Sequence, residues 1–158
     1  HINEVVHFNG KSKELKPTSQ LNFEEIYYQT EPVKIPDAPK GKTSHVPLGT
    51  LFGARSGDKG GCANLGVWAK DLNAFAFLSS FLTIEKLKEL MPDLKEFKID
   101  RFDLPNILSL NFYIHDILED GVSSNSRKDA QAKSLGEYLR AKKANIPSSL
   151  LEALNEYE

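Results

Sequence analysis

The chain has 158 residues and carries 20 Lys and Arg against 22 Asp and Glu, so its formal net charge is −2. Hydrophobic residues make up 40% and charged residues 27%, which is typical of one globular domain and excludes disordered and collagen-like chains. The near-neutral charge argues against a nucleic-acid partner. The longest uncharged run in the middle of the chain, Leu72 to Ile84, is too short to cross a bilayer, which takes roughly 20 apolar residues. The single cysteine excludes an internal disulfide and a multi-cysteine zinc site, and it favours a reducing, cytoplasmic compartment.

The first 46 residues are expected to form an arm or linker. Prolines and lysines are scattered through them, and proline removes a backbone donor and restricts φ. Within this arm, Ile2 to Phe8 and Phe23 to Tyr28 are rich in β-branched and aromatic residues, and each can add one strand to a neighbouring domain. The only methionine is Met91 and nothing near His1 resembles a signal peptide. We therefore expect the chain to be a piece of a longer protein.

Two strands joined by a glycine-rich loop are predicted next. Leu48 to Ala54 is a short apolar run, Gly57 to Gly61 is dense in glycine, and apolar and polar residues alternate from Cys62 to Ala69. Asn73 to Leu82 then has apolar residues at helical spacing. Thr83 is suited to cap a following turn that Pro92 ends, so two short helices or one kinked helix are expected.

The remaining elements complete an α+β pattern. Lys95 to Leu104 and Ile107 to Ile114 are predicted strands, and Ser126 with Asp129 resembles a capping box that starts a helix running to about Lys143. The order is strand, strand, helix, strand, strand, helix. It predicts a two-layer, ferredoxin-like sandwich, in which helices cover one face of a mainly antiparallel four-stranded sheet. This domain is expected to span residues 47–144, followed by a helical tail at 145–158.

The segment from Gly53 to Gly61 is the most distinctive part of the sequence. Three glycines within five residues allow successive N–H groups to turn towards one point, which is one way in which a backbone binds an anion. Arg55 adds a forked donor, Ser56 a hydroxyl and Lys59 a point charge, so phosphate or carboxylate is the expected ligand. The glycine spacing does not match a nucleotide-binding P-loop. The alternative is a structural connection in which Arg55 and Asp58 pair with each other.

A second group of polar residues is predicted to share one face of the sheet. If the apolar positions of the second and fourth strands face the helices, the opposite face carries Asn64, Trp68, Asn111 and Tyr113, with Arg55 close by. Such a face suits a ligand or another subunit. The candidate ligand-binding residues are Arg55, Ser56, Gly57, Asp58, Lys59, Gly60, Gly61, Asn64 and Asn111, and the candidate catalytic residues are Asp58 and Lys59.

Other reactive side chains give weaker signals. Asp129, with Arg127 and Lys133 beside it, is typical of a helix start. His115 and Asp116 form either an acid–base pair or an incidental neighbour pair. Cys62 has no histidine close in the sequence to activate it as a nucleophile. His1, His7 and His45 have no ligand spacing, so neither a metal nor a cofactor is expected.

Several of these motifs occur together in a known family. The residues that carry the resemblance are the run from Ala54 to Gly61, then Asn64, Gly66 and Trp68, then Leu104-Pro105-Asn106 and Leu110-Asn111-Phe112, and finally Arg127, Asp129 and Lys133. With these residues, the chain resembles the C-terminal domain of acyclic terpene utilisation protein A-like (AtuA-like) proteins. The resemblance covers about residues 46 to 150. It implies a ferredoxin-like fold that follows a larger N-terminal domain, in proteins associated with bacterial breakdown of citronellol and geraniol through acyl-CoA intermediates. Cys62 stands where the family is expected to have aspartate or another polar residue.

Two functional hypotheses follow. In the first, this is an accessory domain that assembles with the N-terminal domain of the same protein and as a homo-oligomer, and that presents the Arg55 to Gly61 segment to a small anion. In the second it is part of an enzyme, in which Asp58 or Lys59 acts as acid or base on an acyl-CoA-derived carboxylate held by Arg55, and Asn64 or Asn111 orients a carbonyl. A third reading, an RNA-binding sheet, lacks the basic and aromatic strand motifs that it requires.

Overall fold

The computed structural model of the protein describes residues 4–15 and 31–155, and the chain divides into two compact units, His1–Pro32 and Val33–Glu158. In the first unit, β1 (Glu4–Phe8) pairs antiparallel with β2 (Lys11–Leu15). The turn between them is Asn9-Gly10, with φ of 49° and 73°, as a type I′ hairpin turn requires. Of the strand expected at Ile2 to Phe8, the described part, Glu4–Phe8, is a strand and pairs within its own unit. The one expected at Phe23 to Tyr28 lies outside the described residues.

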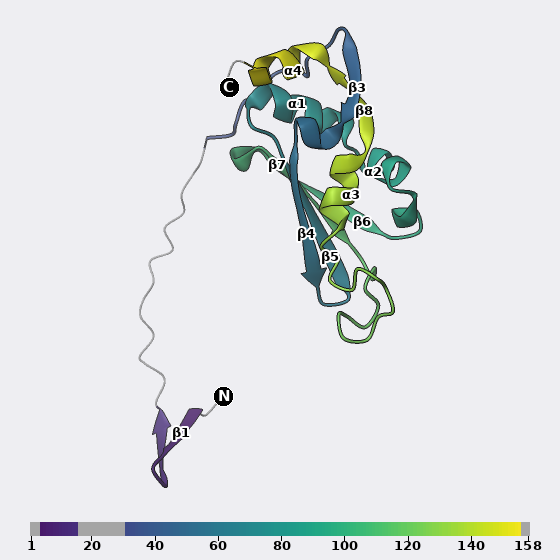
Figure 1. Cartoon of the computed structure of the whole chain (residues 1–158). Coiled ribbons are helices and arrows are strands. Elements are labelled where there is room, and N and C mark those ends of the chain that lie inside the picture. Colours follow the sequence, from purple (N-terminus) through teal and green to yellow (C-terminus); the bar gives the residue numbers. More distant parts are fainter. Residues whose placement is uncertain (1–3, 16–30, 156–158) are drawn as a thin grey trace. The chain divides into compact units, whose positions relative to one another are not determined.

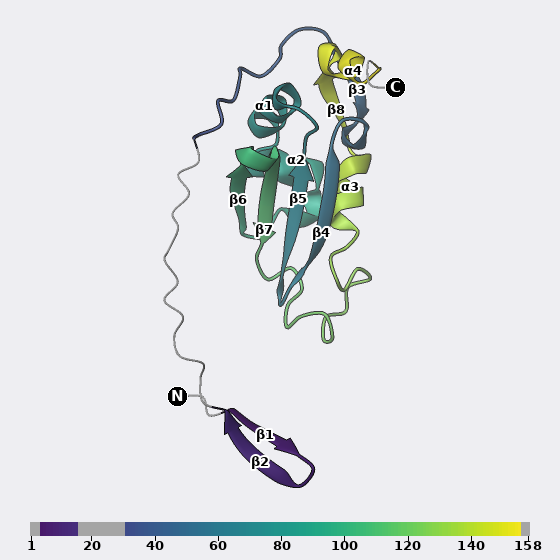
Figure 2. The ribbon, with the colours of Figure 1, turned by 90° about the vertical axis from the view of Figure 1, so that its left-hand side faces the viewer.

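The second unit contains the main sheet. Its strands are β4 (Gly53–Lys59), β5 (Cys62–Trp68), β6 (Ile99–Leu104) and β7 (Ser109–Ile114), and all neighbours are antiparallel in the order β4-β5-β7-β6 (Figure 1). Alternate side chains of β5 and β7 are buried: Ala63, Leu65 and Val67, and Leu110, Phe112 and Ile114. Figure 2 looks onto the sheet, with α2 behind it and α3 beside β4. The other face of β5 and β7, which we call the outer face, carries the polar residues of both strands.

Three helices pack near this sheet: α1 (Leu72–Phe81), α2 (Ile84–Leu90) and α3 (Leu135–Ala141). The Asp71 carboxylate accepts a hydrogen bond from the Ala74 amide at the start of α1, and the Thr83 hydroxyl accepts one from the Lys86 amide at the start of α2. The two short helices and the Thr83 cap are confirmed. Phe75 and Leu78 of α1 and Leu87 of α2 are buried in the core.

The end of α1 is held by an arginine from the sheet. Arg101 of β6 donates to the carbonyl oxygens of Ser79 and Leu82 at 2.8 and 3.1 Å, and its guanidinium also pairs with Asp103. The hydrogen bond from Arg101 is the main reason why the pKa of Asp103 is lowered from its ordinary value. Because the last carbonyl groups of a helix have no partner within it, this side chain fixes α1 against β6.

A second antiparallel pair lies outside the four-stranded sheet. β3 (Thr43–Pro47) pairs with β8 (Lys143–Pro147), and α4 (Ser148–Asn155) follows directly. The sequence predicted neither of these strands. The expected domain boundaries, after residue 46 and after residue 144, each fall within a strand of this pair.

Two predicted elements are wrong in their limits. Leu48 to Ala54 was expected as a strand, but Leu48–Thr50 is a 3₁₀ turn and the strand begins at Gly53. The helix expected from Ser126 starts only at Leu135, because residues 117–134 form a series of turns. None of the described helices is both long and apolar enough to cross a membrane.

Candidate functional site

The outer face of the sheet is organised in rows of directly paired residues. One row runs Gly53, Trp68, Ser109, Leu104; the next runs Arg55, Gly66, Asn111, Phe102; and the third runs Gly57, Asn64, Tyr113, Asp100. The prediction that Asn64, Trp68, Asn111 and Tyr113 share this face with Arg55 is therefore confirmed. The first row carries the Trp68 indole, the second carries Arg55 and the Asn111 amide, and the third carries the Asn64 amide with Tyr113 and Asp100.

The glycine-rich segment forms a β-hairpin. β4 continues through Gly57, Asp58 and Lys59, and Lys59 pairs with Cys62 across a turn of two residues, Gly60 and Gly61. In a strand, successive N–H groups point in alternate directions, so the amides from Ser56 to Asn64 cannot converge on one point as expected. Only Gly60, with φ of 64°, needs the freedom of glycine.

The same register shows which amides remain available. Because Lys59 and Cys62 close the hairpin as a hydrogen-bonded pair, the bonded pairs alternate from there, and the amides of Ser56 and Asp58 point away from β5 to the edge of the sheet. Gly60 and Gly61 lie at the tip, where the Gly61 carbonyl accepts from the Leu118 amide. These two glycines thus pack against the following turns, away from the other candidate ligands.

A pocket of about 380 Å³ lies along β4 and β5. Its lining residues are Arg55, Ser56, Gly57, Asp58, Lys59, Asn64, Gly66 and Lys133. Six of them were candidates from the sequence. Lys133 and Gly66 were not candidate ligands, and Lys133 reaches the pocket from the turns that precede α3. We call this pocket the β4–β5 trough.

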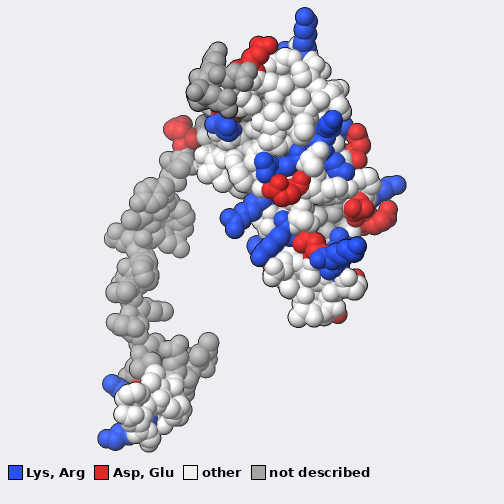
Figure 3. Space-filling model, viewed as in Figure 1, with Lys and Arg blue, Asp and Glu red and all other residues white. Residues whose placement is uncertain are grey.

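The charges at the trough are mainly positive. Within the described part of the chain, Arg55 forms no ion pair, and the Lys59 ammonium donates only to the carbonyl of Asp58, at 2.8 Å. Arg55 lies on the outer face, whereas Asp58 belongs to the opposite face by strand alternation. The alternative in which Arg55 and Asp58 pair is therefore wrong. Figure 3 shows Lys and Arg side chains, with Asp and Glu side chains among them, over the region of β4 and α3.

Ser56 has a structural role at the edge of the trough. Its Oγ accepts a hydrogen bond of 2.9 Å from the Gly136 amide in the first turn of α3. Gly136 is buried, and a Cβ there would lie 3.3 Å from the backbone of Ala54 and Arg55. The serine thus supplies the cap that α3 lacks from its own N-cap residue, Ser134, and it fixes α3 against β4.

The two amides and the indole complete the neighbourhood of the trough. The Asn64 Nδ2 donates to the Asn111 Oδ1 at 3.4 Å, a diagonal contact between β5 and β7, since Asn111 pairs directly with Gly66. The Trp68 indole lies against Gly53, where a Cβ would come within 2.2 Å of the ring, and 42% of Trp68 remains exposed. Asn111 thus supports Asn64 without lining the trough itself.

The part of the chain that forms this sheet matches a known family. The family model described as the AtuA ferredoxin-like domain matches residues 46–145 of the chain. The chain belongs to this family. Searches of curated proteins and of solved structures find no match. The resemblance seen in the sequence and its ferredoxin-like fold are thereby confirmed.

In this AtuA ferredoxin-like domain, the other end of the outer face carries a hydrogen-bonded histidine–aspartate pair that the sequence did not predict. The His115 Nε2 lies 2.7 Å from the Asp100 Oδ2, and the His115 ring meets the Tyr113 ring edge-on at 4.9 Å. His115 therefore pairs with Asp100 and not with Asp116 as one alternative had it. The hydrogen bond from His115 is the main cause that lowers the pKa of Asp100. Only the pairing of β6 with β7 places these residues together, so sequence spacing carried no signal.

Cys62 lies beside this pair on the outer face. Its Sγ accepts from the Asp116 amide at 3.4 Å, and a hydrogen bond with the Cys62 side chain is the main cause that raises the pKa of Tyr113. Over residues 4–15 and 31–155, no three or more His, Cys, Asp and Glu side chains are grouped so as to hold a metal ion.

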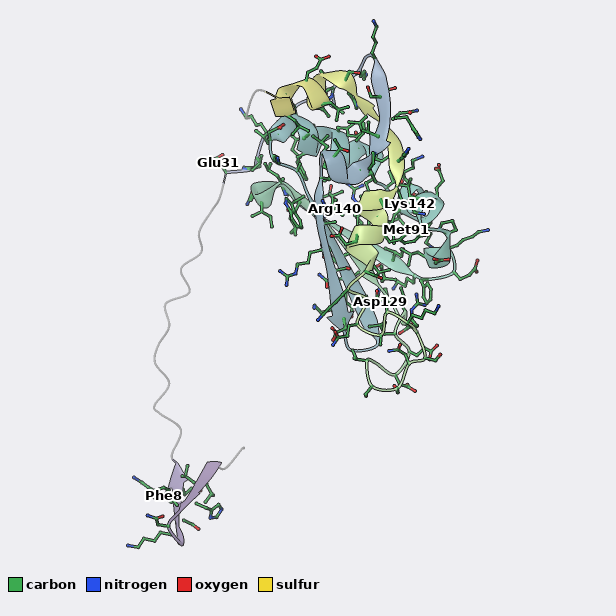
Figure 4. The ribbon with its side chains drawn as sticks, in the orientation of Figure 1. Phe8, Glu31, Met91, Asp129, Arg140 and Lys142 are labelled. Carbon is green, nitrogen blue, oxygen red and sulfur yellow. The ribbon has the colours of Figure 1, made fainter. Side chains whose placement is uncertain are left out.

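The predicted cluster of Arg127, Asp129 and Lys133 serves the start of α3. The Asp129 carboxylate accepts from the amides of Lys133 and Ser134, both at 2.9 Å, and from the Ser134 hydroxyl at 2.6 Å. Burial acts to raise the pKa of Asp129, but the hydrogen bonds from Ser134 and Lys133 outweigh it, so the pKa is lowered. Figure 4 labels Asp129 on the turns before α3 and Arg140 within the helix.

Proposed function

We propose that this domain is an accessory domain that binds a small carboxylate or phosphate in the β4–β5 trough. The observation that carries the proposal is that Arg55, which forms no ion pair among the described residues, lines a pocket that Lys59 and Lys133 also line. Two edge amides, of Ser56 and Asp58, add neutral donors at the border of the same pocket. A guanidinium with neighbouring N–H donors favours an anion over a neutral ligand.

The alternative of an enzyme that uses Asp58 and Lys59 receives no support from this geometry. Asp58 lines the same trough, but strand alternation directs its side chain to the face opposite to that of Arg55. Lys59 lies at the mouth of the trough, two residues along the strand from Gly57 and four from Arg55. An acid or base must come within hydrogen-bond distance of the reacting group. We therefore propose binding rather than turnover as the function of this pocket.

The proposed place of the domain in a larger protein rests on its family. As in the resemblance to AtuA-like proteins, we propose that it follows a larger N-terminal domain, assembles with it and forms a homo-oligomer in acyclic terpene utilisation. We propose that helices cover one face of the sheet in a two-layer sandwich and leave the outer face open to the ligand. Light scattering on the full chain tests the homo-oligomer, which a monomeric mass would contradict.

The anion site can be tested by fluorescence, because Trp68 is the only tryptophan of the chain and lies two residues along β5 from Gly66 of the trough. Titration with inorganic phosphate, acetate and coenzyme A should change its emission with at least one of them. Arg55→Ala should weaken that binding about tenfold or more, since a hydrogen bond to a charged group contributes about 1.5–3 kcal/mol. Binding should also weaken as the salt concentration rises.

Arg127→Ala is the matched control. Arg127 is an exposed arginine that does not line the trough, so its removal changes the net charge by the same amount at another place. Its affinity should equal that of the wild type. Equal affinity of Arg55→Ala and wild type for every anion, or equal losses in both variants, would contradict the proposed site.

A further inference from the structure

At two positions of the trough, neither the backbone conformation nor a lack of space requires glycine. Gly57 and Gly66 lie in the interiors of β4 and β5, and neither has a positive φ. A Cβ at Gly57 would meet nothing closer than the Asn64 Oδ1 at 4.0 Å, and one at Gly66 nothing closer than the Arg55 carbonyl oxygen at 3.7 Å. At Gly53 and Gly61, by contrast, a Cβ would come within 2.2 Å of other atoms.

Glycine inside a strand weakens it and often marks a place where a ligand or another backbone approaches closely. At Gly57 and Gly66 the space above the backbone is open to the trough. A side chain at either position would fill that space without harming the core. The two glycines therefore give the trough a floor of bare peptide backbone.

Four side chains surround the floor at Gly66, and they carry three kinds of chemical group. Across the strands lie Arg55 and Asn111, and along β5, two residues away on either side, lie Asn64 and Trp68. With strands about 4.8 Å apart and about 3.4 Å per residue, these neighbours enclose roughly 10 by 14 Å between their Cα atoms. A guanidinium, two amides and an indole thus surround a patch of backbone the size of one small ring.

The indole side of this floor is apolar. Trp68 rests against Gly53 and keeps 42% of its surface exposed, and Phe102, at the end of the Arg55 row, is 51% exposed. In the Arg55 row and the Trp68 row of the outer face, Arg55 is the single charged residue. Arg55 is thus the cation nearest to the Gly66 floor along these rows, while the Trp68 indole, which lines an adjoining hollow with Gly53, gives the next row an apolar surface.

We propose that the β4–β5 trough binds a carboxylate with a flat, apolar body, an aromatic or conjugated carboxylate. The carboxylate lies on the Arg55 guanidinium, and the planar body lies on the backbone at Gly66 between Asn64 and the Trp68 indole. A planar group gains contact with peptide backbone and indole that a bulky saturated body cannot reach. This inference rests on the proposed anion site and adds the shape of the ligand to it.

The test compares three carboxylates of equal charge: acetate, benzoate and cyclohexanecarboxylate. They are titrated into the full chain labelled with ¹⁵N, and affinities are read from the amide of Gly66 and the indole N–H of Trp68. Benzoate should bind about tenfold more tightly than acetate and several-fold more tightly than cyclohexanecarboxylate, which has a similar size but is not flat. Equal affinity of benzoate and cyclohexanecarboxylate would overturn the inference.

Two variants separate the floor from the cation. Gly66→Val places a branched side chain on the floor and should remove the advantage of benzoate over acetate. Its melting temperature should equal or exceed that of the wild type, because the side chain enters open space and valine favours strands. Trp68→Ala should reduce the advantage of benzoate in the same way. An unchanged benzoate affinity in both variants would overturn the inference.

The outcomes distinguish the two proposals. If all three carboxylates bind equally and Arg55→Ala abolishes their binding, the flat-ligand inference is overturned and the anion site stands. If no carboxylate binds, both are overturned for this class of ligand. If sedimentation instead shows a dimer that dissociates in Gly66→Val and Trp68→Ala, the trough is an interface between copies of the chain, and the inference is likewise overturned.

Discussion

The Asp100–His115 pair shows how one residue of the outer face depends on another. The two side chains come from neighbouring strands and meet at 2.7 Å, at the end of the face away from Trp68. The hydrogen bond from His115 stabilises the charged form of the Asp100 carboxyl and so lowers its pKa. A carboxyl with a lowered pKa stabilises the folded state above its ordinary pKa, and this stabilisation is lost as the pH falls through the lowered value.

His115→Ala should therefore raise the pKa of Asp100 towards its ordinary value. The change is measured by following the Asp100 carboxyl carbon in an NMR titration of wild type and variant. Stability of the two proteins should differ near neutral pH and converge in acid, where Asp100 is protonated in both. The pKa of Asp103, which Arg101 lowers, is the internal reference and should not move. A fixed pKa of Asp100 would show that the hydrogen bond has no part in the shift.

At the residue scale, the sequence predicted which side chains alternate between the two faces of the sheet, but it did not predict the backbone conformation of the glycines. Period-two patterns in β5 and β7 placed Asn64, Trp68, Asn111 and Tyr113 on one face, because burial of the alternate apolar residues allows only one register. Three glycines in five residues gave the same signal as a loop, although only Gly60 has a positive φ. The partner of His115 could not be predicted from the sequence, since Asp100 lies on a neighbouring strand and no local pattern determines the register of that strand.

At the scale of elements, the start of α3 depends on a residue outside the helix. Asp129 lies six residues before Leu135, yet its carboxylate accepts three hydrogen bonds from Lys133 and Ser134. Ser56 of β4 accepts a further bond from Gly136. Together they position the first turn of α3 against β4, and hence Lys133 at the edge of the trough.

Asp129→Ala should destabilise the protein by about 1 kcal/mol, the usual effect of losing a helix-capping side chain. Urea unfolding monitored by circular dichroism measures the change. Asp120→Ala is the control, because Asp120 is an exposed carboxylate in the same stretch of turns, and it should leave stability within about 0.5 kcal/mol of the wild type. A loss in Asp120→Ala as large as that in Asp129→Ala would contradict a specific role of the Asp129 bonds.

Part of this arrangement at the start of α3 could be predicted from the sequence. Asp129 was recognised as a residue that starts a helix, but Ser126 and Asp129 matched a capping box and moved the start forward by nine residues, from Leu135 to Ser126. The stabilising group for the first turn comes from Ser56, 80 residues away in the chain. Only the tertiary structure brings these two residues together, so local patterns could not locate the helix start.

At the scale of the second unit, the β3–β8 pair extends the core past the limits expected for the domain. Ile146 of β8 is fully buried and Ala144 nearly so, whereas Lys143 and Asn145 are exposed. The strand β3 is short and rich in polar residues, and prolines lie around it. These features predict an arm and not a strand of the domain. Its pairing with β8 depends on contact between the two ends of the unit, which no local pattern predicts.

Ile146→Ala should destabilise the protein by about 2–5 kcal/mol, because it removes a buried side chain and leaves a cavity. The free energy of unfolding from urea denaturation measures it. Lys143→Ala, in the same strand but exposed, should change stability by less than about 0.5 kcal/mol. If Ile146→Ala were as stable as the wild type, β8 would not belong to the core of this unit.

The β3–β8 pair also brings together the two limits of the family match, since Val46 pairs with Ala144 and His45 with Asn145. Paired strand residues have Cα atoms about 5 Å apart. A segment whose entry and exit points are neighbours can be spliced into a surface loop of a host protein without forcing the host to open. The ferredoxin-like fold is thus suited to transfer as an inserted cassette that keeps both strands whole, because their outer ends, Thr43 and Pro147, are also paired.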